Sequence, residues 1–169
     1  MPKVKKYHRS YIADFETSGE LMYNTYGRAD VYLGGIVELK ENIKSDDVIL
    51  FTQIKDFFKL ISKLGGRKKT NILIYFHNLT WDGYFILDYL KNNNIPHDTL
   101  IDERGKFYSI FYRVNTRTTV TFYCSYLNTL MAVKNLPGST KTEDLDYNKD
   151  YKKYKLTDFT TKEINYLKQ

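Results

Sequence analysis

Apolar and polar residues recur with two different periods along the chain, and the two periods predict a mixture of strands and helices. Short runs rich in aromatic and β-branched residues predict strands at 10–17, 31–39, 48–51, 71–77, 106–113 and 117–124. Apolar residues at steps of three and four predict a helix that Thr52 caps and Gly65-Gly66 ends. Further helices are predicted at 82–92, at 126–135 and from Lys162 onward.

Several local patterns refine these elements. The run 71–77 is almost continuously apolar, which predicts a strand covered on both faces. Gly34-Gly35 predicts a bulge or a close approach in the second strand. The runs 106–113 and 117–124 predict a hairpin, and Thr160-x-x-Glu163 resembles a capping box. The segment 141–155 is polar and predicts a loop.

The order of these elements predicts one α/β domain over residues 1–169, a mixed sheet flanked by helices. One cysteine, Cys124, excludes a disulfide framework and a four-cysteine zinc site. With no signal-type segment and no apolar stretch long enough to span a bilayer, the sequence predicts a cytoplasmic protein without a membrane partner.

Charge and aromatic content favour nucleic acid as the partner. The net charge is +6, and 16% of the residues are aromatic, sixteen of them tyrosines. Exposed aromatic rings among lysines suit single-stranded nucleic acid, because bases stack on the rings. Alternatively, the tyrosines replace leucine and phenylalanine in the core. Binding is expected to depend on salt and to involve the basic residues Lys3, Lys5, Lys6, Arg67 to Lys69 and Lys149 to Lys155.

Two acidic residues in the first strand are candidates for metal binding. Asp14 and Glu16 are two positions apart, so strand alternation places both carboxylates on one face. Adjacent negative charges are costly unless a proton, water or cation separates them, and Mg²⁺ or Mn²⁺ prefers oxygen ligands. The alternative is a solvated edge strand.

A second polar cluster, 77–83, follows the apolar strand 71–77 and opens a helix. Loops at the ends of strands are where α/β folds place their sites, and Asp82 could complete a site with Asp14 and Glu16. Helix capping is the alternative for Asn78, Thr80 and Asp82. His77 and Trp81 could instead be interior residues.

These segments together resemble a known family. Residues 11–17, Tyr-Ile-Ala-Asp-Phe-Glu-Thr, are similar to the first exonuclease motif of family B DNA polymerases. Residues 75–83 are similar to the second motif in the form found in protein-primed polymerases of phages such as φ29 and of linear plasmids. Residues 144–147, Asp-Leu-Asp-Tyr, and 161–168 resemble a conserved stretch and the start of the third motif of that group.

The resemblance implies a ribonuclease H-like (DnaQ-like exonuclease) fold and 3′→5′ hydrolysis of single-stranded DNA. Asp14, Glu16 and Asp82 would hold two ions of Mg²⁺ or Mn²⁺, and Tyr166 would orient the attacking water. The path of the 3′ end would be lined by Phe15, Thr17, His77, Asn78, Trp81, Ser125 and Tyr147.

Two departures from the family pattern leave alternatives open. The aspartate of the third motif would fall at position 170, after Gln169, so three acids are expected here, and Lys141 is not in register with the family's basic residue. The alternative is a catalytically impaired exonuclease fold that binds nucleic acid, or a host nuclease or defence complex, and inhibits it. A third interpretation is an α/β interaction domain with no nucleic-acid role.

Overall fold

A seven-stranded mixed sheet forms the centre of the molecule. The computed structural model describes residues 7–17, 29–65, 68–131 and 154–168, and their sheet has the order β3-β2-β1-β4-β7-β6-β5. β4 is parallel to β1 and to β7, and the other pairs are antiparallel. The strands are β1 (Tyr7–Thr17), β2 (Val31–Glu38), β3 (Ile49–Phe51), β4 (Thr70–Phe76), β5 (His97–Ile101), β6 (Phe107–Arg113) and β7 (Thr118–Cys124).

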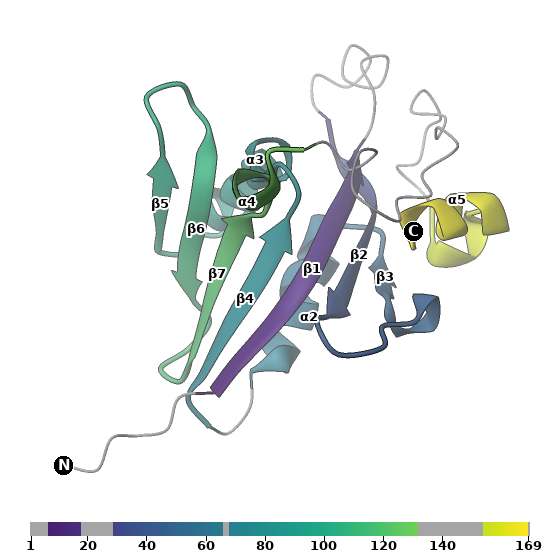
Figure 1. The fold of residues 1–169 in the computed structure, drawn as a ribbon, viewed down its shortest axis with the longest axis horizontal. Helices are drawn as coiled ribbons and strands as arrows, with labels where there is room; N and C mark the ends of the chain where they lie inside the picture. Colours follow the sequence, from purple (N-terminus) through teal and green to yellow (C-terminus); the bar gives the residue numbers. More distant parts are fainter. Residues whose placement is uncertain (1–6, 18–28, 66–67, 132–153, 169) are drawn as a thin grey trace.

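Helices lie against both faces of this sheet (Figure 1). The two longest, α2 (Ile54–Leu64) and α3 (Leu79–Asn92), lie together on one face. The shorter helices are α4 (Tyr126–Thr129) and α5 (Thr161–Leu167), and two 3₁₀ turns are η1 (Ser45–Asp47) and η3 (Leu156–Asp158). This arrangement confirms the predicted α/β mixed sheet flanked by helices.

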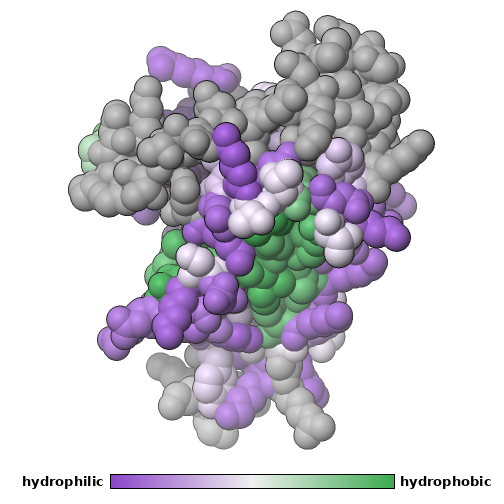
Figure 2. Space-filling view, turned by 90° about the vertical axis from the view of Figure 1, so that its right-hand side faces the viewer, coloured by the Kyte–Doolittle hydropathy of each residue, from purple (hydrophilic) through white to green (hydrophobic). Residues whose placement is uncertain are grey.

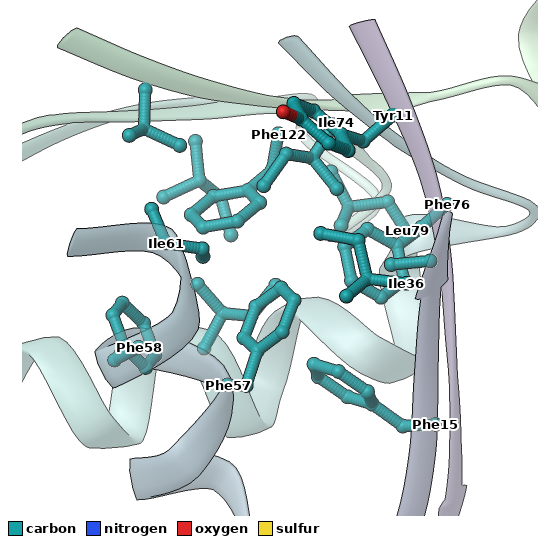
Figure 3. Close-up of a cluster of buried hydrophobic side chains, with 14 of the residues drawn as sticks. Tyr11, Phe15, Ile36, Phe57, Phe58, Ile61, Ile74, Phe76, Leu79 and Phe122 are labelled. Atoms are coloured by element: carbon teal, nitrogen blue, oxygen red, sulfur yellow. The ribbon is translucent and has the colours of Figure 1, made fainter. Parts of the chain in front are cut away.

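The main core fills the space between the sheet and the helices α2 and α3 (Figure 3). Phe57 of α2 is fully buried, and its ring centroid lies 5.0 Å from that of Phe15 in an edge-to-face contact. The Phe15 ring also contacts Phe76 edge-to-face at 4.9 Å. Such aromatic pairs stabilise the core by about 0.5–1.5 kcal/mol beyond their burial.

The opposite face of the sheet carries α5. A small separate cluster holds this helix, formed by Tyr32, Leu33 and Phe159 with Tyr154, Ile164 and Leu167 packed against it. Leu167 lies over Gly35, where an added β-carbon would be 3.3 Å from Leu167 Cδ2. Gly34 accommodates the Phe51 ring on the other face, so the predicted close approach at the two glycines is confirmed.

Several sequence predictions need correction. β5 has no counterpart among the predicted strands, and its residues are mostly exposed. The N-cap of α2 is Gln53, not Thr52, and α3 begins at Leu79 rather than at residue 82. The helix after β7 ends at Thr129, because Leu130 adopts a left-handed conformation.

The structure confirms some of the other sequence predictions and revises others. The β6–β7 hairpin and the Thr160/Glu163 capping box are both present. β4 alternates between buried and half-buried residues, so the prediction of two covered faces is wrong for the described structure. The segments 132–135 and 141–153 lie outside the described residues. No helix in the described ranges is long and apolar enough to cross a membrane.

Candidate active site

The candidate site lies where β1 and β4 separate. The two parallel strands are in register only as far as the pair Ile12–Tyr75. β1 continues to Thr17, whereas β4 ends at Phe76 and leads into α3. The carboxyl end of β1 therefore faces the first turn of α3, at the kind of strand-end crevice where α/β sheets place their ligands.

Asp14 and Glu16 share one face of β1, as their spacing predicts. Tyr11, Ala13 and Phe15 point into the core on the other face. Asp14 is exposed, whereas Glu16 is buried, with 5% of its surface accessible. β2 supplies the cross-strand neighbours Gly35 and Leu33. The pair is therefore not on a solvated edge strand.

Asp82 brings a third carboxyl group to this pair from α3. It is 4% exposed, and burial, followed by the negative charge of Asp14, raises the pKa of Asp82 to about 8. The backbone N–H of Phe15 donates a hydrogen bond to this carboxyl group. Within the described residues, Asp82 Oδ1 has no hydrogen-bond partner. A buried oxygen of this kind is costly unless a proton or cation satisfies it.

The carboxylate oxygens of these three acids suit a hard divalent cation, although the acids do not form a complete coordination site. In the part of the chain that the structure describes, no three Asp, Glu, His or Cys side chains are close enough together to hold one ion. The charges of Asp14 and Glu16 nevertheless both raise the pKa of Asp82, so the three carboxylates repel one another once Asp82 is ionised. Carboxylate oxygens are the ligands that Mg²⁺ and Mn²⁺ prefer, and a cation would relieve this repulsion.

Trp81 and Thr17 join α3 to the end of β1. Trp81 Nε1 donates a hydrogen bond of 3.2 Å to Thr17 Oγ1. Thr17 is buried, whereas 56% of the Trp81 surface is accessible, so Trp81 is not an interior residue. The hydrogen bond holds an exposed aromatic ring at the edge of the carboxylate cluster.

His77, Asn78 and Ser125 lie at the carboxyl ends of the neighbouring strands. His77 Nδ1 lies 3.4 Å from Ser125 Oγ, and Ser125 Oγ donates to the Phe76 carbonyl at 3.2 Å. Asn78 adopts a left-handed conformation with φ 63° and is exposed. Its side chain does not cap α3, so the capping alternative does not account for it.

The remaining predicted site residues have different placements. Phe15 points its side chain into the core and turns only its backbone toward Asp82. Tyr166 is buried in α5. The next residue of this helix, Leu167, packs on Gly35, the cross-strand partner of Asp14 in β2. Tyr147 and Lys141 lie outside the described residues.

The predicted basic runs lie only partly within the described ranges. Lys68 and Lys69 precede β4, at the opposite end of the parallel strands from Asp14. Lys155 is exposed, and the other members of these runs are outside the described ranges. Sequence reasoning missed Lys106, which lies over the Tyr126 ring at 5.3 Å, while that ring contacts His77 edge-to-face. No motif marks this lysine, because tertiary contacts alone bring it to the site.

Comparisons with known proteins find similarity to DNA polymerases. No family model matches the chain. The DNA polymerase of Streptococcus phage Cp-1 is 30% identical over 105 residues, which cover 59% of this chain and 18% of that polymerase.

Solved structures of phi29 DNA polymerase match most of the chain. An orthorhombic crystal form gives a TM-score of 0.69 at 21% identity, and the complex with single-stranded DNA gives 0.64 at 22% identity. Each match covers 95% of this chain and 28% or 29% of the polymerase, respectively, so the chain spans less than a third of the relatives it matches. The chain therefore has the mixed-sheet, ribonuclease H-like fold of the exonuclease domain of phi29 DNA polymerase, as its resemblance to protein-primed polymerases implied.

Proposed function

We propose that this chain acts as a 3′→5′ exonuclease-type domain that hydrolyses single-stranded DNA with the help of divalent cations. The observation that carries the proposal is the buried Asp82 carboxyl group, which lies close enough to Asp14 and Glu16 to have its pKa raised by both. Buried carboxyl groups are usually paired with cationic side chains, so a buried acid surrounded by two further acids at a strand end points to ion binding.

Asp14, Glu16 and Asp82 would hold Mg²⁺ or Mn²⁺ in this proposal. When bound, the ions supply an activated water and stabilise the charge that develops on the phosphodiester and its leaving oxygen. Tyr166, carried by α5 on the same face of the sheet as Asp14, would orient that water. The support for this role is that α5 contacts the sheet beside the acids, where Leu167 packs on Gly35, the cross-strand partner of Asp14.

The exposed ring of Trp81 would stack on a base near the 3′ end of the strand. Base–aromatic stacking contributes about 1–3 kcal/mol per base and tolerates any sequence. Thr17 fixes the indole through its hydrogen bond, and Asn78, His77 and Ser125 supply polar groups on the neighbouring strand ends. The solved complexes of phi29 DNA polymerase with single-stranded and primer-template DNA support a DNA substrate for this fold.

The test is release of nucleotides from single-stranded DNA labelled at either end. The wild-type chain is incubated with Mg²⁺, Mn²⁺ or a chelator, beside Asp14→Ala and Asp82→Asn. Asp98→Asn, on the exposed edge strand β5, is the matched control. We expect metal-dependent loss from the 3′ end, reduced at least a hundredfold in both site variants and unchanged in the control.

Two outcomes would overturn the proposed activity. One is cleavage that survives both site substitutions, which would place the chemistry elsewhere or in a contaminant. The other is no release at high protein concentration with either metal. If single-stranded DNA is then still bound, the fold serves as a binding domain, as in the inhibitory alternative.

A further inference from the structure

A cavity opens beside the carboxylates, on the same face of the sheet. Its volume is about 350 Å³, and it begins at Asp14 and continues toward the amino end of β1. The floor is formed by Ile12 and Val37, a cross-strand pair of β1 and β2. None of the proposed substrate-contacting side chains Thr17, His77, Asn78, Trp81 and Ser125 lines it.

Most of the residues that line this cavity are apolar. Val48 and Ile43 form the part next to η1, and Leu167 forms the part contributed by α5. Ile12 and Ile43 are 44% and 41% exposed, which is high for isoleucine beside a sheet. Figure 2 shows hydrophobic residues at the surface between polar ones on the side of the molecule that carries β3 and α5. A concave apolar surface of this size is typical of a small-molecule site.

Two lysines give the cavity a positive charge. Lys44 lines it just before η1, and Lys168 lines it at the end of α5. Lys168 Nζ lies 3.6 Å from Asp46 Oδ1, but the Asp46 side chain is 99% exposed, so water screens the pair. An anion could therefore displace Asp46 at little cost. Asp14, which also lines the cavity, would repel an anion and so fix its orientation toward the lysines.

The cavity also touches the helix that carries Tyr166. Leu167 and Lys168 line the cavity, and Leu167 also packs on Gly35. The cluster that holds α5 on the sheet has Tyr32, Leu33 and Phe159 as its buried residues, and none of these three lines the cavity. A molecule in the cavity would therefore add a second set of apolar contacts to α5 and would hold the helix against the sheet.

We propose that this cavity binds a small amphipathic anion, an apolar body with one acidic group, and that the bound molecule clamps α5 onto β2. The apolar body occupies the space between Ile12, Val37 and Leu167, and the acidic group lies at Lys44 and Lys168. The binding stands independently of catalysis. Its effect on hydrolysis, through the position of Tyr166, rests on the proposed function.

Titration with 8-anilinonaphthalene-1-sulfonate, which has this chemistry, tests the site. We expect one molecule to bind per chain, with ¹H–¹⁵N chemical-shift changes centred on Gly35, Val37 and Leu167. Lys44→Gln and Lys168→Gln should each weaken binding about threefold to tenfold, and Ile43→Trp, which fills the mouth, should weaken it further. Lys68→Gln, at the far end of β1, is the matched control and should bind as the wild type does.

The clamp is tested by hydrogen exchange of the α5 amides with and without the bound sulfonate. We expect slower exchange in α5 and unchanged exchange in α2. Shift changes elsewhere on the sheet, or equal binding by wild type, Ile43→Trp and the lysine variants, would overturn the site. Unchanged α5 exchange with the site occupied would overturn the clamp. Both readouts are independent of nuclease activity, so failure of the exonuclease proposal leaves them interpretable.

Discussion

Leu167 of α5 lies over Gly35 of β2, at the point where Gly35 pairs with Asp14 of β1. A β-carbon at Gly35 would be 3.3 Å from Leu167 Cδ2 and 3.0 Å from Val48 Cγ1. Because cross-strand neighbours point to the same face, the bare backbone at Gly35 lets α5 settle beside an acidic residue of the candidate site. The close approach of α5 to the strand pair at Asp14 thus depends on the absence of a side chain at Gly35.

Gly35→Ala should displace α5 by a few tenths of an ångström without unfolding the protein. The two nearest atoms that the new β-carbon would meet, Val48 Cγ1 and Leu167 Cδ2, are side-chain methyl groups, so they can shift. We expect faster hydrogen exchange in α5 and a several-fold lower rate of nucleotide release, with little change in single-stranded DNA affinity. Wild-type exchange in α5 would show that Gly35 does not control the helix.

Gly34→Ala should have a different consequence, because its new methyl group would enter the main core. The added β-carbon would overlap the Phe51 ring and would be 3.2 Å from the Asp14 carbonyl oxygen. Overpacking of this kind costs about 1–3 kcal/mol or more. Urea denaturation should show that loss, and Phe51→Leu in the Gly34→Ala background should recover part of it. A purely additive double mutant would argue against the Phe51 clash.

The elements that the sequence predicts correctly are those whose patterns are local. The alternation of Tyr11, Ala13 and Phe15 sets the buried face of β1, and Asp14 and Glu16 therefore have to share the other. The glycine pair indicates close approach, and the Thr160/Glu163 spacing indicates where α5 begins. The buried face of β1 and the start of α5 depend on neighbours a few residues away, which a sequence pattern records. At the glycine pair the pattern indicates a close approach but not its distant partners Phe51 and Leu167.

Features that depend on tertiary contacts were not predictable. β5 is mostly exposed, and it is a strand because β6 offers it an edge. α3 begins three residues early because Leu79 is fully buried in the core, where packing outweighs the capping preference of later residues. The motif that contains Phe15 indicates the site. The Phe15 side chain nevertheless lies in the core, and only the backbone N–H of Phe15 contacts Asp82.

Asp82→Asn should stabilise the metal-free protein at alkaline pH. The pKa of Asp82 is raised to about 8, so its stabilising protonated form is fully present below its unfolded pKa, near 4. That contribution is lost progressively as the pH rises through 8. In chelator at pH 9, the asparagine variant should therefore be more stable than wild type, by on the order of a few kcal/mol.

Urea midpoints at pH 5 and pH 9, with chelator or Mn²⁺, check this prediction. At pH 5 the two proteins should differ little, and Mn²⁺ should stabilise only the wild type at pH 9. A variant less stable than wild type at pH 9 in chelator would mean that the ionised Asp82 is better compensated than its burial indicates.

The ion pair between Arg9 and Glu38 should make stability depend on pH in the opposite direction to Asp82. Arg9 Nε and Nη2 each donate to a different Glu38 carboxylate oxygen at 2.9 Å, and Nη1 donates to the Leu64 carbonyl at the end of α2. The hydrogen bond from Arg9 lowers the pKa of Glu38. Its stabilisation is therefore present above the unfolded glutamate pKa and is lost as the pH falls through the lower folded value.

Glu38→Gln should accordingly destabilise the protein at pH 7 and matter less in acid. More than a third of each side chain is exposed, so solvent screening limits the loss to about 1 kcal/mol or less. Denaturation at pH 7 and pH 3 measures the difference. Glu41→Gln, in the exposed turn after β2, is the control and should show neither the loss nor its pH dependence.

Trp81 should report binding of single-stranded DNA through its fluorescence, because it is the only tryptophan in the chain. A base stacked on the exposed indole would quench the emission, and the apparent affinity should fall as salt rises.

Thr17→Val keeps the side-chain shape but removes the acceptor of the indole N–H. Loss of that hydrogen bond should weaken binding several-fold, corresponding to about 0.5–1.5 kcal/mol. Thr119→Val, whose hydroxyl donates to Asn71 at the opposite end of the parallel strands, should bind normally. Emission that does not respond to single-stranded DNA, while an independent binding assay detects the complex, would remove Trp81 from the DNA path.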